Sequence, residues 1–401
     1  MNRLDMYRAV SAKSDTKVVL LVMDGVGGLP REPGGTTELE TAKTPNLDAV
    51  AVRSVCGMAD PVAPGITPGS GPGHLGLFGF NPAEVQIGRG VLAALGIGFE
   101  LKDGDVPARI NFATLDDRGN VTDRRAGRIA NDLCVELAAK LDKIELPGAE
   151  VFVRPVKEHR AAVVFRAPGL AGEVCDTDPQ KTGVPPLEPK GAGAAGEATA
   201  KLAAAFIAEA RKSLADQPKA NGVLLRGFDC YEPLPTLEEI FKIRCAAVAA
   251  YPMYRGISRL VGMDVLETGE TPAEEFATVR EHFDAYDFFF VHIKKTDSYG
   301  EDGDFDHKVG VIESVDQALP ALLDLKPDAL IVTGDHSTPA VLKSHSWHPV
   351  PTMICAERCR ADAVATYGET ACIAGGLGRL PLMDVLPIAL ANAGKLGKFG
   401  A

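Results

Sequence analysis

The sequence predicts an α/β fold in which a mostly parallel sheet domain is interrupted by an inserted second α/β (or α+β) domain. Short, uninterrupted apolar runs that end in polar residues occur at 18–25, 286–297 and 328–336. Such runs are typical of strands buried on both faces of a parallel sheet. An amphipathic helical pattern at 305–325 separates the last two runs, and more than 200 residues separate the first run from the others. Strand, helix and strand in this order indicate an α/β domain, and the long separation indicates an insertion.

Composition limits the classes of protein to which the chain can belong. The 401 residues carry 42 Lys and Arg against 54 Asp and Glu, a net charge of −12, and 46% are hydrophobic. A chain of this length forms two or three structural units, and its acidity argues against nucleic acid or an anionic membrane as the main partner. The N-terminus lacks the apolar core of a signal peptide, and the eight cysteines show no repeated spacing. We therefore expect a cytoplasmic protein with free thiols.

The N-terminal part of the predicted domain combines one strand with a glycine-rich loop. Residues 1–16 are polar and predict a flexible tail, after which VVLLVMDG (18–25) predicts a central strand. GITPGSGPGHLGLFGF (65–80) is a Gly/Pro-rich loop that enters an apolar helix, with Ser70 near its start. A helix amino terminus presents free N–H groups and the positive end of the dipole, so this loop predicts a phosphate site.

The middle of the chain, 85–262, predicts the inserted domain. It mixes strands and a helix, which we expect at 108–115, 150–156, 160–167 and 197–214. The flanking segments 17–84 and 263–401 then form one discontinuous domain, and the chain crosses between the two domains twice. The second flanking segment contains the two apolar runs at 286–297 and 328–336. The strand predicted in the first run ends in Lys-Lys-Thr-Asp, and the strand predicted in the second ends in Gly-Asp-His.

Three aspartates stand at the carboxyl ends of the predicted strands of the first domain. They are Asp24, Asp297 and Asp335, and His336 follows the last directly. A single Asp after a strand is usually a turn or cap residue. In parallel sheets, ligands bind beyond the carboxyl ends of the strands, so we expect the three aspartates to lie together at one edge of the sheet. Their like charges repel one another unless a cation binds between them. Asp and His together suit Mn²⁺, Mg²⁺ or Zn²⁺.

Further candidate ligands lie nearby in the sequence. Glu301 follows Asp297 by four residues, a spacing that places both carboxylates on one side of a helical turn, where Glu301 could also bind the metal. A solvent-exposed turn explains this acidic loop equally well. We expect either His345 or His348 to reach the metal site. Ser70, an N-cap residue in the simpler interpretation, becomes a nucleophile when a divalent cation lowers its pKa. We expect His292 in the core, and we expect three further histidines on the surface: His159, His282 and His307.

Arginines predict an anion pocket, because guanidinium groups match carboxylate and phosphate geometry. For any single helical arginine, a solvated face is the alternative. The candidates concentrate in two segments of the predicted insert, and they are Arg124, Arg125, Arg128, Arg255 and Arg259. Arg89 and Arg226 stand beside glycines outside helical patterns.

An ordered set of motifs resembles the archaeal-type 2,3-bisphosphoglycerate-independent phosphoglycerate mutases of the alkaline phosphatase superfamily. The set includes VVLLVMDGVGG, ITPGSGPGHLGLFGFNP, TDRRAGRI, KKTDSYGEDGDF, TGDHSTP and SHSWHPVP. The resemblance implies an alkaline-phosphatase-like domain that holds two divalent metal ions, Mn²⁺ or Mg²⁺ with Zn²⁺ as an alternative. One ion would be held by Asp24, Ser70, Asp335 and His336, and the other by Asp297 and His345, with Glu301 where the wider family has His. Lys294 and the arginines of the insert would hold the phosphate and carboxylate groups.

The same resemblance implies interconversion of 3-phosphoglycerate and 2-phosphoglycerate through a phosphoserine formed on Ser70. A metal-dependent phosphatase and a homoserine-kinase-like phosphotransferase are the enzymatic alternatives, and a non-catalytic metabolite-binding protein is the third. The sequence leaves the oligomeric state and the preferred metal open.

Overall fold

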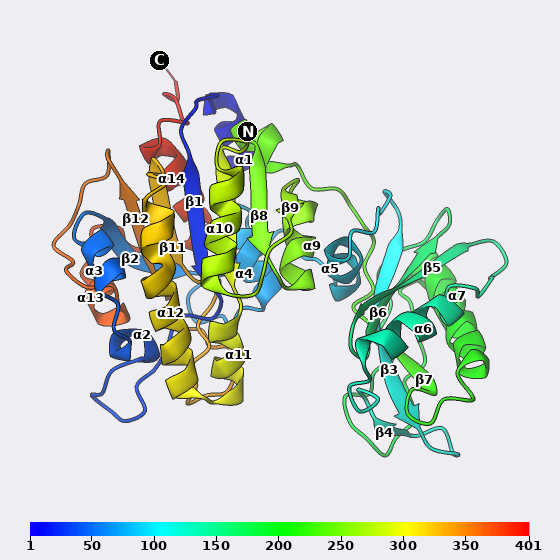
Figure 1. Ribbon diagram of the computed structural model, residues 1–401. Coiled ribbons are helices and arrows are strands. Elements are labelled where there is room, and N and C mark those ends of the chain that lie inside the picture. The colour runs from blue at the N-terminus through cyan, green and yellow to red at the C-terminus, as the bar shows by residue number, and fades with distance from the viewer. Residues whose placement is uncertain (401) are drawn as a thin grey trace. The chain divides into compact units, whose positions relative to one another are not determined.

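The computed structural model describes residues 1–400, and the chain divides into two compact units (Figure 1). The first unit comprises Met1–Gln86, Pro235–Tyr251 and the chain from Val261 onward, and the second comprises Ile87–Leu234 and Pro252–Leu260. The chain therefore passes between the units four times, where the sequence predicted two crossings around 85–262. Among residues 1–400, no helix combines the length and the apolarity needed to cross a bilayer.

The first unit is built on an eight-stranded sheet with the order β13-β2-β12-β11-β1-β10-β8-β9. Most neighbouring strands run parallel, and only β12 runs antiparallel to its two neighbours, β11 and β2. The mostly parallel α/β sheet predicted from the apolar runs is thus confirmed. The strands are β1 (Val18–Met23), β2 (Val55–Asp60), β8 (Cys245–Ala249), β9 (Asp264–Leu266), β10 (Phe288–Ile293), β11 (Ala329–Thr333), β12 (Val350–Ala356) and β13 (Gly378–Pro381).

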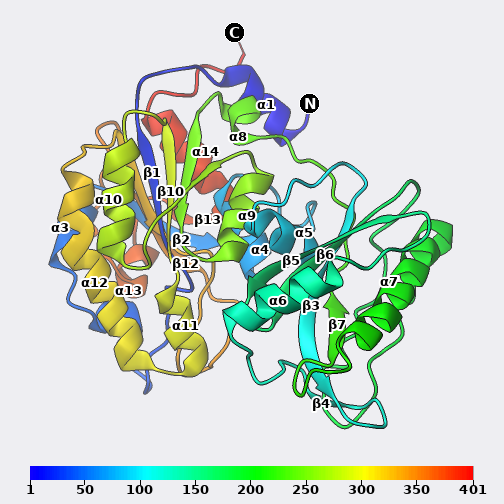
Figure 2. The ribbon, with the colours of Figure 1, turned by 45° about the vertical axis from the view of Figure 1, so that its right-hand side comes forward.

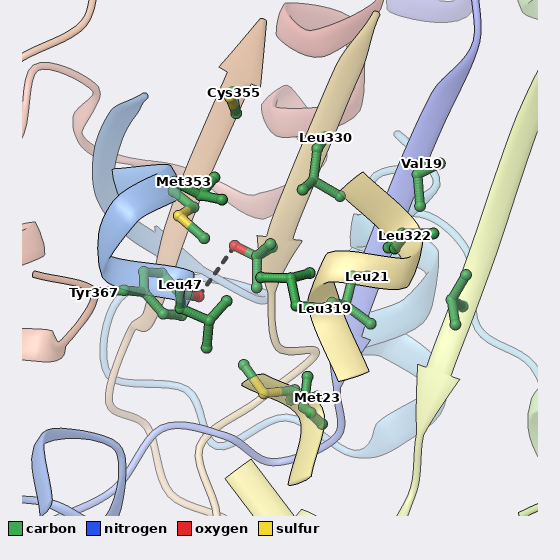
Figure 3. Packing of buried hydrophobic residues seen from close by; sticks show 14 of the residues in the cluster. Val19, Leu21, Met23, Leu47, Leu319, Leu322, Leu330, Met353, Cys355 and Tyr367 are labelled. Atoms are coloured by element: carbon green, nitrogen blue, oxygen red, sulfur yellow. Dashed lines mark hydrogen bonds between the residues drawn. The ribbon is translucent and has the colours of Figure 1, made fainter. Parts of the chain in front are cut away.

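Helices cover both faces of this sheet. Those of the first unit are α1 (Arg3–Val10), α2 (Glu38–Thr41), α3 (Pro45–Ala51), α4 (Ser70–Leu77), α8 (Leu237–Phe241), α10 (Pro272–His282), α11 (Lys295–Asp302), α12 (Phe305–Leu323), α13 (Glu369–Ile373), the 3₁₀ turn η1 (Leu382–Asp384) and α14 (Val385–Asn392). Figures 1 and 2 show α10 and α12 side by side in front of the central strands. In Figure 3, Leu319 and Leu322 of α12 face Leu21 and Val19 of β1, within one buried cluster.

The side chains of β10 point alternately to the two faces of the sheet, so this one apolar strand packs against the residues that cover each face. Phe289 and Val291 pack into the cluster beneath α10 and α12. Phe290 and His292 point to the opposite face, where the Phe290 ring lies 5.0 Å from the ring of Phe78, just past α4. Successive side chains of a strand point to opposite faces, so a fully apolar run is what a strand covered on both sides requires.

Strand β8 extends the sheet from within the segment that the sequence assigned to the insert. Its five residues are fully or almost fully buried and pair in parallel with β10 on one side and β9 on the other. Their sequence, CAAVA, is short and dominated by alanine, which has no preference for strands. Pairing with distant strands rather than local propensity therefore makes it a strand.

The N-terminal residues form structure where the sequence predicted a flexible tail. Residues 3–10 form α1, capped by the Asn2 side chain, and the Tyr7 ring lies 5.6 Å from the Phe241 ring of α8. The backbone of Ala12 donates to Lys395, and that of Gly397 donates to Val10. These long-range contacts with the C-terminal segment hold the polar N-terminus, and no local pattern reveals them.

The second unit is built on a five-stranded antiparallel sheet. The order is β4-β3-β6-β5, with β7 also paired to β3, and α6 and α7 share its apolar core. The predicted strands and helix at 108–115, 150–156, 160–167 and 197–214 are confirmed with small shifts. The elements are α5 (Arg89–Gly96), β3 (Val106–Leu115), β4 (Val121–Asp123), α6 (Asn131–Leu141), β5 (Glu150–Lys157), β6 (Arg160–Arg166), α7 (Gly193–Ser213), β7 (Gly222–Arg226) and α9 (Pro252–Leu260).

Candidate functional site

Three adjacent strands in the middle of the first sheet bring the three aspartates together. Asp24 follows β1 directly, Asp335 follows β11 after one residue, and Asp297 lies in the first turn of α11 beyond β10. The order β11-β1-β10 makes these strands neighbours, and all three run parallel. Their carboxyl ends therefore meet at one edge, where all three carboxylates are buried.

Two overlapping groups of side chains have the composition and spacing of cation sites. One group is Asp24, Asp335 and His336, and the other is Asp297, His336 and His345. In each group the potential ligand atoms lie within 4.8 Å of one another. His336 belongs to both groups, whereas the resemblance assigned it to the first only. Carboxylate oxygen and imidazole nitrogen together suit Mn²⁺, Zn²⁺ or Mg²⁺.

The first group contains buried carboxylate oxygens that lack a hydrogen-bond donor. Oδ1 of Asp24 and Oδ2 of Asp335 are fully buried and, within residues 1–400, make no hydrogen bond of regular geometry, although Nδ1 of His74 lies 3.2 Å from the Asp335 oxygen. Nε2 of His336 lies 3.4 Å from the first oxygen and 3.1 Å from the second. Buried charged oxygens without a donor are costly unless a cation coordinates them, so these residues fit a metal ion.

The electrostatics of the edge favour added positive charge. Burial lowers the pKa of His336, but the surrounding carboxylates, Asp335 first, raise it to about 9. Burial and the neighbouring Asp335 carboxylate raise the pKa of Asp24, but Lys294 and His292 lower it more, to about 2. The same negative field that holds a proton on the imidazole attracts a divalent cation.

Lys294 lies among the candidate metal ligands. Its Nζ donates to Oδ2 of Asp24 at 3.0 Å and also to Oδ2 of Asp297. These two carboxylates raise the pKa of Lys294 although burial opposes them. The resemblance assigned Lys294 to the phosphate and carboxylate groups of the substrate, and the structure shows it neutralising the two aspartates.

Ser70 stands at the first position of α4, beside the first group. Its Oγ lies 3.4 Å from Nε2 of His336, and its carbonyl oxygen lies 2.8 Å from Nδ1 of His74. A Cβ on Gly73 would come within 2.3 Å of the Asp335 carbonyl oxygen, so only glycine lets α4 approach the loop after β11 so closely. The glycine-rich sequence thus places the hydroxyl at the candidate metal site, with the N–H groups of the first helical turn beside it.

His345, rather than His348, is the histidine that returns to the site. Its Nδ1 lies 2.9 Å from the Pro68 carbonyl oxygen, which only accepts, so Nδ1 carries the hydrogen and Nε2 is left for a ligand. Nε2 lies 3.5 Å from Asp297 and 3.8 Å from Glu301. Glu301 is more than half exposed and belongs to neither group. His348 contacts the Ser346 hydroxyl instead.

A second concentration of charge lies in the second unit, around His159. Burial, followed by the positive charges of four nearby arginines, lowers the pKa of His159 to about 4. On the sheet, Arg109 of β3 pairs directly with Arg226 of β7. Asp176 and Asp178 pair with Arg226, but the positive charge of the six gathered arginines exceeds the charge of these two acids, so this cluster suits an anionic ligand. Its arginines are Arg89, Arg109, Arg125, Arg128, Arg160 and Arg226.

The five predicted insert arginines have different surroundings. Arg125 and Arg128 join the cluster, on a loop that the Asp123 side chain organises by accepting from the backbone of Arg125 and Gly127. The other three make different contacts. Arg124 forms a two-point ion pair with Asp178, which also pairs with Arg226 of the cluster, and Arg255 lies on α9. Arg259 donates to the Leu95 and Gly96 carbonyls at the end of α5.

Sequence reasoning missed the centre of this cluster. His159 is almost completely buried, whereas we expected it on the surface, and Arg109 and Arg160 were not singled out. Arg160, at the start of β6, opposes Asn111 of β3, and Arg109 precedes Asn111 by two residues on the same strand. A polar residue inside an apolar strand pattern was the available signal. His292 is buried as expected and lies 3.3 Å from Asp24.

Comparisons with known proteins point to one family. A family model described as 2,3-bisphosphoglycerate-independent phosphoglycerate mutase matches residues 51–220. The chain is 51% identical to a Thermotoga neapolitana protein named "Probable 2,3-bisphosphoglycerate-independent phosphoglycerate mutase", over 99% of this chain and 100% of the relative. It is 48% identical to a Thermus thermophilus protein of the same name, over the full length of both. The solved cofactor-independent phosphoglycerate mutase of Thermoplasma acidophilum is similar with a TM-score of 0.70 and 28% identity, over 94% of this chain and 100% of that one.

Proposed function

The chain belongs to the 2,3-bisphosphoglycerate-independent phosphoglycerate mutases, and we propose that Ser70 is the nucleophile of this isomerase. The enzyme interconverts 3-phosphoglycerate and 2-phosphoglycerate. These relatives favour the mutase over the phosphatase and the homoserine-kinase-like phosphotransferase of the sequence-based alternatives. The observation that carries the assignment of Ser70 is its position 3.4 Å from His336, the residue shared by both candidate cation groups.

Two divalent cations fit the ligand groups, and we assign each a set of residues. Asp24, Asp335, His336 and Ser70 would hold one, and Asp297 and His345 would hold the other, with His336 close to both. Bound cations lower the pKa of a coordinated hydroxyl and neutralise phosphoryl oxygens. The structure supports this assignment through the buried, donor-free oxygens of Asp24 and Asp335. Glu301, exposed and 3.8 Å from His345, is the weakest candidate ligand.

The reaction that we propose transfers one phosphoryl group twice. Oγ of Ser70 gives up its proton and attacks phosphorus, the bond from phosphorus to the glycerate oxygen breaks, and that oxygen takes up a proton. The glycerate reorients, and its other hydroxyl gives up its proton and attacks the phosphoserine. The bond from phosphorus to Oγ of Ser70 then breaks, and Oγ takes up a proton. The N–H groups of Ser70 and Gly71, at the start of α4, would stabilise the charge that develops on the phosphoryl oxygens.

Within the second unit, we propose the arginine cluster around His159 as the site for the anionic groups of the substrate. Guanidinium groups bind carboxylate and phosphate oxygens in pairs, which fixes orientation as well as affinity. Arg125 and Arg128 keep their sequence-based assignment, and Arg89, Arg109, Arg160 and Arg226 join them. Arg124 and Arg259 instead support the unit through Asp178 and the end of α5.

An enolase-coupled assay with 3-phosphoglycerate, run with and without Mn²⁺ and without any nucleotide, tests this function. We expect turnover that depends on the cation, releases no inorganic phosphate and falls to background in Ser70→Ala. Acid-quenched wild-type enzyme should carry phosphate on Ser70. Substantial mutase activity in the Ser70→Ala variant would remove Ser70 as nucleophile, and full activity without metal would contradict the cation assignment.

A further inference from the structure

Thr338, a residue that no motif argument singled out, touches ligands of both candidate cation groups. It is fully buried in the loop after β11. Its Oγ1 lies 2.7 Å from Oδ1 of Asp297 and 2.9 Å from Nδ1 of His336. Asp297 belongs to one group only, and His336 completes the group of Asp24 and Asp335. One hydroxyl therefore joins the two groups.

The hydrogen positions in this chain of contacts follow from simple counting. The Asp297 carboxylate, paired with Lys294, can only accept, so the single hydroxyl hydrogen of Thr338 points to Asp297. Oγ1 must then accept from His336, which places a hydrogen on Nδ1. The other ring nitrogen, Nε2, faces Ser70 and the Asp335 carboxylate, and its lone pair becomes available to a cation when its proton leaves.

The backbone around Thr338 holds this hydroxyl in place. The Thr338 amide donates to the Gly27 carbonyl oxygen at 3.0 Å, and its carbonyl oxygen accepts from Nζ of the buried Lys308 at 2.8 Å. A Cβ on Gly25, whose φ is +62°, would lie 2.4 Å from Oγ1 of Thr338. Only glycine fits at this position, so the backbone of the loop after β1 packs directly against the Thr338 hydroxyl.

We infer that Thr338 is a positioning residue that sets the tautomer of His336, orients Asp297 and thereby couples the two cation groups. This inference rests on the proposed function, because it assigns the hydroxyl a role toward cations that are themselves proposed. Residues that hydrogen-bond a metal ligand fix the orientation of that ligand, and removing such a residue lowers the metal affinity about 10- to 100-fold.

The test compares Mn²⁺ binding to metal-free protein, measured by electron paramagnetic resonance and calorimetry. Thr338→Val keeps the shape and removes the hydroxyl, and Thr338→Ser keeps the hydroxyl. We expect Thr338→Val to bind Mn²⁺ at least 10-fold more weakly, and Thr338→Ser to stay within about 3-fold of wild type. Thr338→Ala removes the hydroxyl without crowding and serves as the second variant if the valine variant folds poorly.

A matched control separates positioning from general packing. Thr352 of β12 is equally buried, and its hydroxyl lies 2.7 Å from that of Thr333. Thr352→Val should lower thermal stability and leave Mn²⁺ affinity unchanged. In Zn²⁺-loaded enzyme, nitrogen NMR should show a slowly exchanging Nδ1–H of His336 in wild type and Thr338→Ser, and rapid exchange in Thr338→Val.

The outcomes distinguish this inference from the proposed function. Wild-type affinity in Thr338→Val and Thr338→Ala, or an equal loss in Thr338→Ser, overturns the positioning role alone, provided that Asp24→Asn abolishes binding. Absence of Mn²⁺ binding that depends on Asp24 in the wild-type protein overturns the cation assignment, and the inference falls with it.

Discussion

Replacing the buried Lys308 by methionine should destabilise the first unit through the two loops that carry Asp24 and His336. Lys308 is fully buried, and its Nζ donates to the carbonyl oxygens of Gly25 at 2.9 Å, Gly27 at 3.2 Å and Thr338 at 2.8 Å. Methionine keeps the length of the apolar stem and removes all three hydrogen bonds. The nearest carboxylate, Glu38, lies 3.8 Å away and is equally buried.

The magnitude follows from what the change leaves behind. A buried acceptor without a donor costs about 1–3 kcal/mol, and removing one member of a buried ion pair costs about 3–5 kcal/mol. Burial lowers the pKa of Lys308 in spite of Glu38, so removing the charge also relieves a desolvation cost. We therefore expect Lys308→Met to lower the free energy of unfolding by about 3–5 kcal/mol.

Urea unfolding followed by circular dichroism in metal-free buffer measures this loss. Lys43→Met, at an exposed position of the same unit, is the matched control and should change stability by less than about 0.5 kcal/mol. Glu38→Gln should cost less in the Lys308→Met background than in wild type, because the pair is already broken. A Lys308→Met variant as stable as the Lys43→Met control would refute the reasoning.

Three further predictions concern the cations, the arginine cluster and a buried acid. Mn²⁺ at 100 times its dissociation constant should stabilise the wild-type enzyme by about 2.7 kcal/mol per site, and a thermal midpoint that does not rise with Mn²⁺, or rises equally in Asp24→Asn, would contradict the site. Arg89→Met should raise the KM for phosphoglycerate at least 10-fold, because a charge-assisted hydrogen bond is worth about 1.5–3 kcal/mol; an unchanged KM in initial-rate assays would place the substrate anion elsewhere. Burial and then the neighbouring acids raise the pKa of Glu275 from 4.5 to about 9, so the folded state binds more protons than the unfolded state between these values and stability falls as pH rises. Glu275→Gln should match wild type at pH 4 and exceed its stability by about 2–4 kcal/mol at pH 8 in urea unfolding, and equal curves at both pH values would refute the shift.

Local sequence signals were sufficient to place the chemistry at strand ends. Apolar runs closed by Asp-Gly, Lys-Lys-Thr-Asp and Gly-Asp-His predict buried parallel strands with acids beyond them. The helix start at Ser70 follows from its glycine-rich loop. These features depend on residues close together in the chain, such as strand alternation and the close approach that only glycine permits, so the sequence expresses them directly.

The grouping of these residues was decided by the tertiary structure. Asp24 lies beside Asp297 and Asp335 only because β1 pairs with both β10 and β11, and pairing between distant strands leaves no local trace. The same holds for β8, whose alanine-rich sequence is a strand because β10 and β9 flank it. Thr338 lies in the segment TGDHSTP, but the sequence singled out neither Thr338 nor Lys308, because their roles follow from hydrogen bonds to segments tens to hundreds of residues away. Sequence determines which chemical groups stand at each strand end, whereas long-range packing decides which of them share a site.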